Sequence, residues 1–178
     1  MDILQYPDER LKQVSEAVED FNDELQTFAA QLEITMCAGP GGVGIAAPQV
    51  GRFQRIVIVD ISGMRKIPAK STNNGRMILI NPEITEWEGM AMGREGCMSV
   101  LDFTGNVIRA EKISVTAFDE LGEQHEYHCE GYEARAVQHE VDHLDGLLFL
   151  DRLVSRRTDL FKRKVYKGRA ETRTKGKG

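Results

Sequence analysis

The sequence has little of several features that define large classes of proteins. Three cysteines in 178 residues are too few for the disulfide framework of a small secreted domain, and they fit a reducing cytoplasm. No apolar run is long enough to cross a membrane. Residues 1–5 have neither the basic and apolar blocks of a signal peptide nor the Arg/Ser-rich character of a transit peptide. These absences predict a cytoplasmic protein that does not span a membrane.

The length and the hydrophobic content of 41% are those of one globular domain. Apolar spacing predicts a helix from about residue 20 to 39, and buried strands over 55–61 and 77–80 with a mobile loop, 62–76, between them. A hairpin of strands is predicted over 112–119 and 124–129, followed by a helix from Tyr132 to Gly146. The expected fold class is α+β: antiparallel strands packed around the central helix 132–146, with an N-terminal helix and a basic C-terminal helix or tail.

Formal charge is unevenly distributed along the chain. Residues 156–178 contain ten Lys/Arg and two acidic residues, whereas residues 1–155 contain thirteen Lys/Arg and twenty-six acidic residues. Such a basic terminus is commonly a solvated, partly disordered segment. The alternative is electrostatic attraction to a polyanion such as RNA. The sequence leaves both explanations open.

The segment QHEVDH, residues 138–143, contains the HExxH pattern. In a helix, residues four apart leave the same face about one turn apart, so His139 and His143 can bind one metal ion. Glu140 lies about 100° round the helix from His139, where its carboxylate can act as a base on a water at that metal. The pattern indicates metal-assisted hydrolysis. The alternative is an amphipathic helix whose buried histidines bind no metal.

A catalytic site of this kind usually needs a third protein ligand. The downstream position that holds a third histidine in the longer zinc-protease pattern is Phe149, and the only later glutamate, Glu171, lies in the basic tail. Upstream, Cys97 lies in the Gly-flanked segment REGCMS and completes a Cys/His/His set, because thiolate binds first-row metals well. Cys37 and Cys129, at the end of a predicted helix and on a predicted strand, are better explained as buried or unused thiols. His125 and His128 are better explained as surface residues of the same strand.

The segment GVGIAAPQ, residues 42–49, combines glycines and small residues with a polar amide. Glycines allow a backbone to approach a ligand closely, and Gln49 offers a neutral side-chain donor. The segment lacks the GxGxxG pattern, so it predicts no nucleotide cofactor. It suits peptide binding, although a plain glycine-rich turn would have the same composition.

The three segments GVGIAAPQ, EGCMS and QHEVDH, in this order and spacing, resemble the peptide deformylase family. The resemblance runs from about Leu4 to Leu153 and implies a catalytic domain over residues 1–153, with a basic extension over 154–178. It implies hydrolysis of the N-formyl group from the initiator methionine of nascent polypeptides, releasing formate. It also implies, as in the family, ribosome docking through the basic extension.

The resemblance assigns roles to individual residues. Cys97, His139 and His143 correspond to the metal ligands, Glu140 to the general base, and Gln49 and the backbone N–H of Met98 to donors that stabilise the tetrahedral intermediate. Ferrous iron is the family's usual metal, while the affinity order allows Zn²⁺ or Ni²⁺ in an isolated sample. The positions that correspond to the peptide-binding groove and its pocket are Val43, Gly44, Ile45, Gly96, Tyr132, Arg135 and Ala136.

Some positions depart from the family's usual pattern. Met98 stands where Leu is usual, Leu101 where Pro is frequent, and Thr104 aligns with an arginine that contacts the peptide in many bacterial members. Glu95 and Arg109 match positions that form either an ion pair behind the metal site or a solvated surface pair. A metallohydrolase of different specificity and a non-catalytic binding module are the competing interpretations, although the intact ligand and base set argues against the module.

Overall fold

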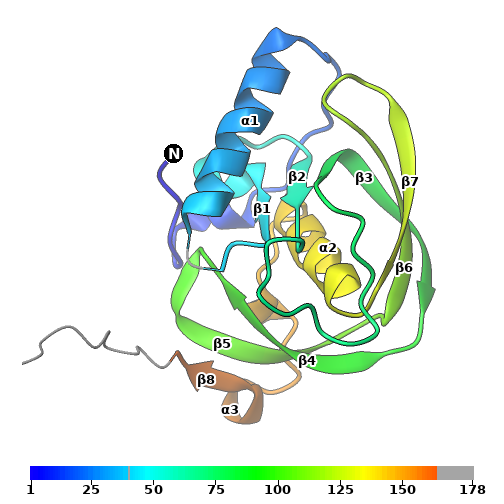
Figure 1. Cartoon of the computed structure of the whole chain (residues 1–178). Coiled ribbons are helices and arrows are strands. Elements are labelled where there is room, and N and C mark those ends of the chain that lie inside the picture. Colours follow the sequence, from blue (N-terminus) through cyan, green and yellow to red (C-terminus); the bar gives the residue numbers. More distant parts are fainter. Residues whose placement is uncertain (40, 164–178) are drawn as a thin grey trace, which may run out of the picture.

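The computed structural model describes residues 1–39 and 41–163. It contains two antiparallel sheets, one of five strands in the order β1-β2-β3-β6-β7 and one of three in the order β4-β5-β8. Helix α2 lies at the centre with strands around it, and helix α1 covers one side (Figure 1).

The strands are β1 Gly44–Ala46, β2 Ile56–Val59, β3 Met77–Glu88, β4 Ala91–Cys97, β5 Val100–Arg109, β6 Lys112–Phe118, β7 Gln124–Glu130 and β8 Leu160–Lys162. The helices are α1 Asp23–Ala38, α2 Gly131–Leu144 and α3 Arg156–Asp159, with 3₁₀ turns at Glu9–Lys12, Ala47–Val50 and Phe149–Asp151. The predicted α+β class is confirmed.

The first helix forms where its apolar spacing predicts. Asn22 caps it, because its side-chain oxygen accepts a hydrogen bond of 3.0 Å from the backbone N–H of Leu25. Its buried face packs against strands β1 and β2. The residues of that face are Leu25, Ala29, Leu32 and Met36.

Strand β2 separates two hydrophobic clusters, so its four residues are all buried. Val57 and Val59 belong to the cluster that includes Val137 and Leu144 of α2. Ile56 and Ile58 belong to the cluster that includes α1. Because successive side chains of a strand point to opposite faces, a continuous apolar run is what a doubly covered strand requires. The five-stranded sheet therefore lies between α1 and α2 and fixes the position of α2.

The sheet differs from the prediction in three places. Strand β3, predicted over 77–80, continues to Glu88 through irregular pairing with β6 at Ile80/Glu83 and Ile84/Glu86. Residues 44–46, expected in a loop, form strand β1 paired with β2. Strands β4 and β5 were not predicted at all, because their glycines and charged residues mask the period of two.

The segment 62–76 contains no helix or strand, as expected, but its second half is bound to the start of α2. The backbone N–H of Asn74 donates to the buried carboxylate of Glu133 at 2.7 Å, and Thr72 donates to the same carboxylate through its hydroxyl. The hydroxyl of Ser71 accepts from the backbone N–H of Tyr132 at 2.9 Å. These bonds satisfy groups at the amino end of α2, which would otherwise lack partners.

The start of the basic extension is part of the three-stranded sheet. Strand β8 pairs with β5 in the register Phe103↔Lys162, Thr104↔Phe161 and Gly105↔Leu160. Residues 164–178, the rest of the predicted basic tail, lie outside the described residues. None of the helices in the described part of the chain has the length and apolar character needed to cross a bilayer.

Asn81 provides a test of how the N-terminal segment is joined to the sheet. Its side chain accepts from the backbone N–H of Val18 at 2.8 Å and donates to the Val18 carbonyl at 2.9 Å, and its own φ is +50°. Because Asn tolerates this conformation and makes both bonds, Asn81→Ala should lower the free energy of unfolding by about 2 kcal/mol. Urea denaturation measures the change. Asn73→Ala, which removes one exposed bond to Gly75, should change it by less than about 0.5 kcal/mol.

Candidate active site

Helix α2 carries two histidines and a glutamate on its buried faces. It begins at Gly131, whose φ is +63° and where a side chain would collide with the carbonyl of Lys70. It ends before Gly146, whose φ of +71° suits a glycine after a helix. His139, Glu140 and His143 are 8%, 6% and 2% exposed. The helix therefore holds all three side chains away from bulk solvent.

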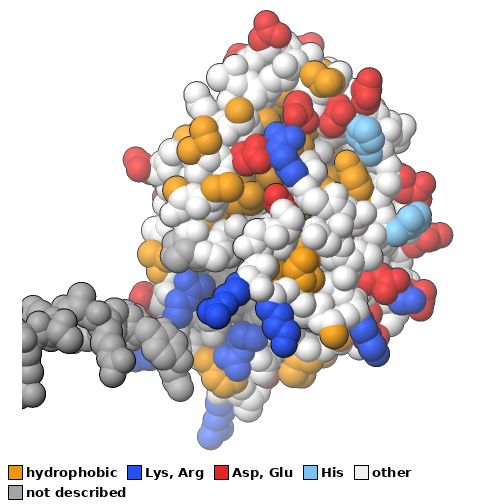
Figure 2. Space-filling view, in the orientation of Figure 1, with side chains coloured by type: hydrophobic (Ala, Val, Ile, Leu, Met, Phe, Trp, Pro, Cys, Tyr) orange, Lys and Arg blue, Asp and Glu red, His pale blue; other side chains and the backbone are white. Residues whose placement is uncertain are grey.

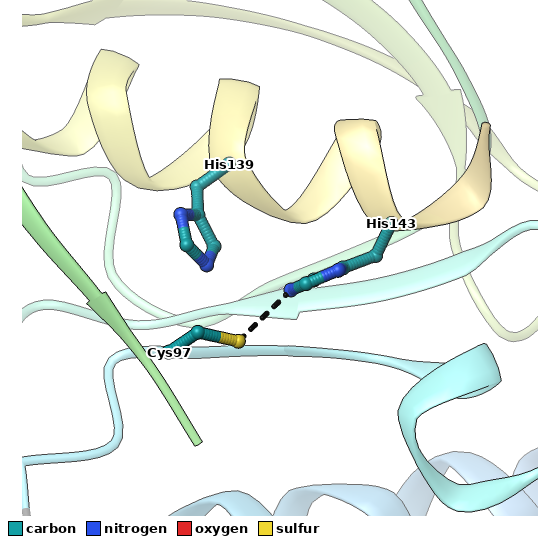
Figure 3. Close-up of side chains that lie close together, drawn as sticks. All are labelled: Cys97, His139 and His143. Carbon is teal, nitrogen blue, oxygen red and sulfur yellow. Dashed lines mark hydrogen bonds between the residues drawn. The ribbon is translucent and has the colours of Figure 1, made fainter. Parts of the chain in front are cut away.

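Cys97, at the end of β4, meets the two histidines (Figure 3). One donor atom from each of Cys97, His139 and His143 lies within 4.8 Å of the other two. The Sγ atom of Cys97 is 3.3 Å from Nε2 of His143. Of the three cysteines, only Cys97 belongs to such a group within the described residues, since Cys129 is buried on β7 and Cys37 is exposed at the end of α1.

The ring of His139 is oriented by Glu95. Its Nδ1 atom lies 2.8 Å from Oε2 of Glu95, so Nε2 is left to face the cysteine side. Glu95 in turn accepts from Nε and Nη2 of Arg109, at 3.0 and 3.1 Å, and from Arg135 at 2.9 Å. Burial alone would raise the pKa of Glu95, but the hydrogen bonds from His139 and Arg109 hold it well below its usual range. Of the two alternatives for Glu95 and Arg109, the buried ion pair is the one observed.

The charged network continues to the molecular surface. Arg109 donates to Asp142 at 2.6 Å, and Asp142 also accepts from Arg152 at 2.5 and 3.0 Å. Asp142 is 5% exposed. The sequence analysis did not identify Asp142 or Arg152, because nothing in their local pattern shows that they meet Arg109. The Asp142 carboxylate of α2 therefore balances part of the charge of Arg109 on β5.

The Glu140 carboxylate is buried but, unlike that of Glu95, lacks a hydrogen-bond partner for one of its oxygens. Its Oε2 atom is buried and has no hydrogen-bond partner among the described residues. Burial raises the pKa of Glu140 to about 7. A side chain on Gly44 would come within 2.5 Å of its Oε1 atom, so the glycine allows β1 to pass close to this carboxylate. A buried carboxyl with a pKa near neutrality and an unused oxygen is suited to accept and return a proton.

Gln49 lies next to Cys97 with its amide fixed. Its Oε1 accepts from the backbone N–H of Ala46 at 2.9 Å, and its Nε2 lies 3.4 Å from Cys97 Sγ and 3.1 Å from Ser99 Oγ. The donor end of the amide therefore points to the Cys/His/His group. Met98 occupies the turn between β4 and β5, immediately after Cys97.

A cavity of about 70 Å³ adjoins Glu140 and His139. Five of the seven residues expected to contact the peptide line it; these are Val43, Gly96, Tyr132, Arg135 and Ala136. Of the other two, Gly44 contributes the close approach to Glu140, while the side chain of Ile45 is buried in the cluster with α1. Arg94 also lines the cavity and was not predicted, although it precedes Glu95 in the motif segment. The larger cavity of about 670 Å³ lies over β3, β6 and β7, away from these groups.

The donor set fits a divalent first-row metal. Burial alone would raise the pKa of Cys97, but the charges and hydrogen bonds of His143 and His139 hold it well below its usual range. Burial likewise opposes the charge on His139, yet its hydrogen bonds with Cys97 and Glu95 raise its pKa well above the usual value. A thiolate beside a protonated imidazole is an ion pair that metal binding would replace, with release of a proton. The unpartnered Glu140 oxygen beside this group is consistent with a base that acts on water there.

Comparisons with known proteins agree with this geometry. The family model described as "Polypeptide deformylase" matches residues 1–159. The chain is 39% identical over 164 residues to the peptide deformylase of Thermodesulfovibrio yellowstonii, which covers 92% of this chain and 95% of that protein. It is 41% identical over 167 residues to the peptide deformylase of Alkalilimnicola ehrlichii, and this alignment covers 94% of this chain and 89% of that protein.

Solved structures show the same fold. A peptide deformylase from Legionella pneumophila has a TM-score of 0.77 and 40% identity, covering 85% of each chain. A peptide deformylase from Ehrlichia chaffeensis in complex with actinonin has a TM-score of 0.81 and 32% identity, covering 88% of this chain and 90% of that one.

Three independent properties thus agree: a buried Cys/His/His group beside a glutamate, a family match over most of the chain, and the same fold in solved relatives. The chain therefore belongs to the polypeptide deformylase family, and it is a metal-dependent hydrolase that removes the N-formyl group from nascent peptides.

Proposed function

We propose that Cys97, His139 and His143 hold one divalent metal ion, Fe²⁺ in the cell. The observation that supports this best is the convergence of one thiolate and two imidazoles in a buried group. Zn²⁺ and Ni²⁺ stand above Fe²⁺ in the affinity order for such donors, so an isolated sample can contain either. When bound, the metal activates the attacking water and polarises the formyl carbonyl.

We assign the proton transfers to Glu140. Its carboxylate takes a proton from the attacking water and delivers one to the amine nitrogen as the formyl C–N bond breaks. The developing negative charge on the formyl oxygen is stabilised by the Nε2 donor of Gln49 and the backbone N–H of Met98. Gln49 is supported by its fixed amide, which already points to Cys97. Donors of this kind are typically worth about 10²–10³ in rate.

The substrate proposed is a nascent peptide that begins with formyl-methionine. Its first side chain enters the cavity between Val43, Tyr132, Arg135 and Ala136, and its backbone runs between β1 and Gly96. The cavity's position beside Glu140 supports this placement. We further propose a cytoplasmic location, which the free cysteines support, and a catalytic unit over residues 1–153 with the extension 154–178 as a ribosome-docking segment.

Glu140→Gln tests the assignment of the base. The variant should retain the metal and lose about 10²–10⁴-fold in kcat, because it cannot accept the proton of the water. Formate release from formyl-Met peptides and metal content of the purified protein are the two measurements. Glu126→Gln, on the exposed face of β7, should behave as the unaltered chain. Turnover of Glu140→Gln at the parent rate would refute the mechanism, and release of acetate from acetyl-Met peptides by the unaltered chain would indicate a broader amide hydrolase.

Glu95→Gln tests the orientation of His139. Replacing the carboxylate weakens the bond to Nδ1 and leaves Arg109 without its partner, so metal affinity should fall about 10–100-fold. Competition with a chelator measures the affinity, and circular dichroism verifies the fold. Glu88→Gln removes an equal charge from an exposed pair with Lys112 and should leave the affinity unchanged. Equal affinities for the two variants would contradict the role of Glu95.

A chain that ends after Arg163 tests ribosome docking. It retains β8 and lacks residues 164–178, which contain six Lys/Arg and one Glu. If the extension binds ribosomal RNA, the shortened chain should lose most of its cosedimentation with ribosomes at low salt. Its kinetic constants for short formyl peptides should stay at parent values. Unchanged cosedimentation would rule out docking by this segment.

A further inference from the structure

Strand β8 brings the basic extension to the edge of the candidate active site. The register places Gly96 of β4, Thr104 of β5 and Phe161 of β8 in one row across the three-stranded sheet. The backbone N–H of Arg163 donates to the carbonyl of Asp102 at 2.8 Å, which fixes the residue that follows β8. The extension is therefore joined to β5, which is the neighbour of the strand β4 that carries Cys97.

The side chain of Arg163 returns across the sheet to Gly96. A side chain built on Gly96 would overlap with the guanidinium of Arg163 and would lie 3.4 Å from the Cγ2 atom of Thr104. The glycine therefore leaves the space that the guanidinium occupies. Among residues 1–39 and 41–163, no acidic side chain forms an ion pair with Arg163. Its charge is thus held over β4 without a partner in the described part of the chain.

A second arginine lies on the same side of β4. The guanidinium carbon of Arg94 lies 3.5 Å from the centre of the Phe161 ring, and its Nη1 donates to Thr104 at 3.2 Å. Arg94 and Gly96 both line the cavity beside Glu140. Residues 160–163 therefore supply both Arg163 and the aromatic ring of Phe161, which holds Arg94. Lys and Arg side chains gather over this part of the visible face (Figure 2), in a protein whose formal net charge is −5.

We propose that Arg163 is a substrate-binding residue, which donates to backbone carbonyl oxygens of the residues that follow the formylated one. The inference rests on the proposed course of the peptide along Gly96. A chain that leaves the cavity along Gly96 passes beside this guanidinium, whose fork of donors matches carbonyl oxygens of any sequence. A contact with backbone rather than side chains suits an enzyme whose substrates share only their first residue.

The test compares Arg163→Gln with the unaltered chain on two amidated substrates, formyl-Met-Ala-Ser amide and formyl-Met amide. The variant should raise KM about fivefold for the tripeptide amide and leave kcat within about twofold, because an exposed charge-assisted bond is worth little more than this. For formyl-Met amide, which is too short to reach Arg163, KM should stay at the parent value. If Arg163 had only a structural role, the substitution would change KM for both substrates alike.

Lys162→Gln is the matched control. Lys162 is the exposed neighbour on β8 and carries the same charge, but the atoms nearest to a side chain built on Gly96 belong to Arg163 and Thr104. Its KM for the tripeptide amide should not change. Equal effects of the two variants, equal effects on the two substrates, or a parent KM for Arg163→Gln would each overturn the proposal. Failure of the proposed function would look different, because the unaltered chain would release no formate from either substrate.

Discussion

The active site depends on one buried carboxylate, that of Glu95. It accepts from Arg109 and Arg135 and lies 2.8 Å from Nδ1 of His139. These contacts connect β4, β5 and α2, which belong to different parts of the chain. A buried carboxylate is costly unless it is paired and hydrogen-bonded. The fold therefore has to bring two arginines and a histidine to Glu95. The same contacts fix the orientation of the His139 ring, which faces Cys97.

For this reason the pKa values of the two glutamates in the site are shifted in opposite directions. Glu95 has partners for both of its oxygens, and their hydrogen bonds and charges outweigh burial, so its pKa is low. Glu140 is equally enclosed but has an oxygen without a partner, and burial raises its pKa to about 7. The first carboxylate stays charged and holds geometry, while the second can exchange a proton near neutral pH. The difference comes from their partners, since both are buried glutamates within a few residues of the Cys/His/His group.

The sequence was sufficient for the parts of the site whose chemistry lies within a local motif. The HExxH spacing predicted a helix from Tyr132 to Gly146, and α2 spans Gly131–Leu144. The strands that carry Cys97 and Arg109 were missed, because Gly93, Gly96 and Gly105 have no side chains to show the alternation of a strand. Asp142 was visible only as a residue of the motif, since its ion pair with Arg109 is set by tertiary packing. The local sequence pattern thus predicts the candidate metal ligands, whereas tertiary packing determines which side chains orient them.

The three-stranded sheet has a second consequence for how the chain is divided. In sequence, a boundary after residue 153 separates a catalytic unit from a basic extension. In space, β8 pairs with β5 and its Phe161 holds the Arg94 guanidinium beside the cavity. Removal of the whole extension would therefore change the charge next to this cavity as well as any affinity for RNA. Any effect of such a truncation on activity can be assigned only when residues 156–163 are kept, because α3 contacts β5 and β8 belongs to the sheet that carries Cys97.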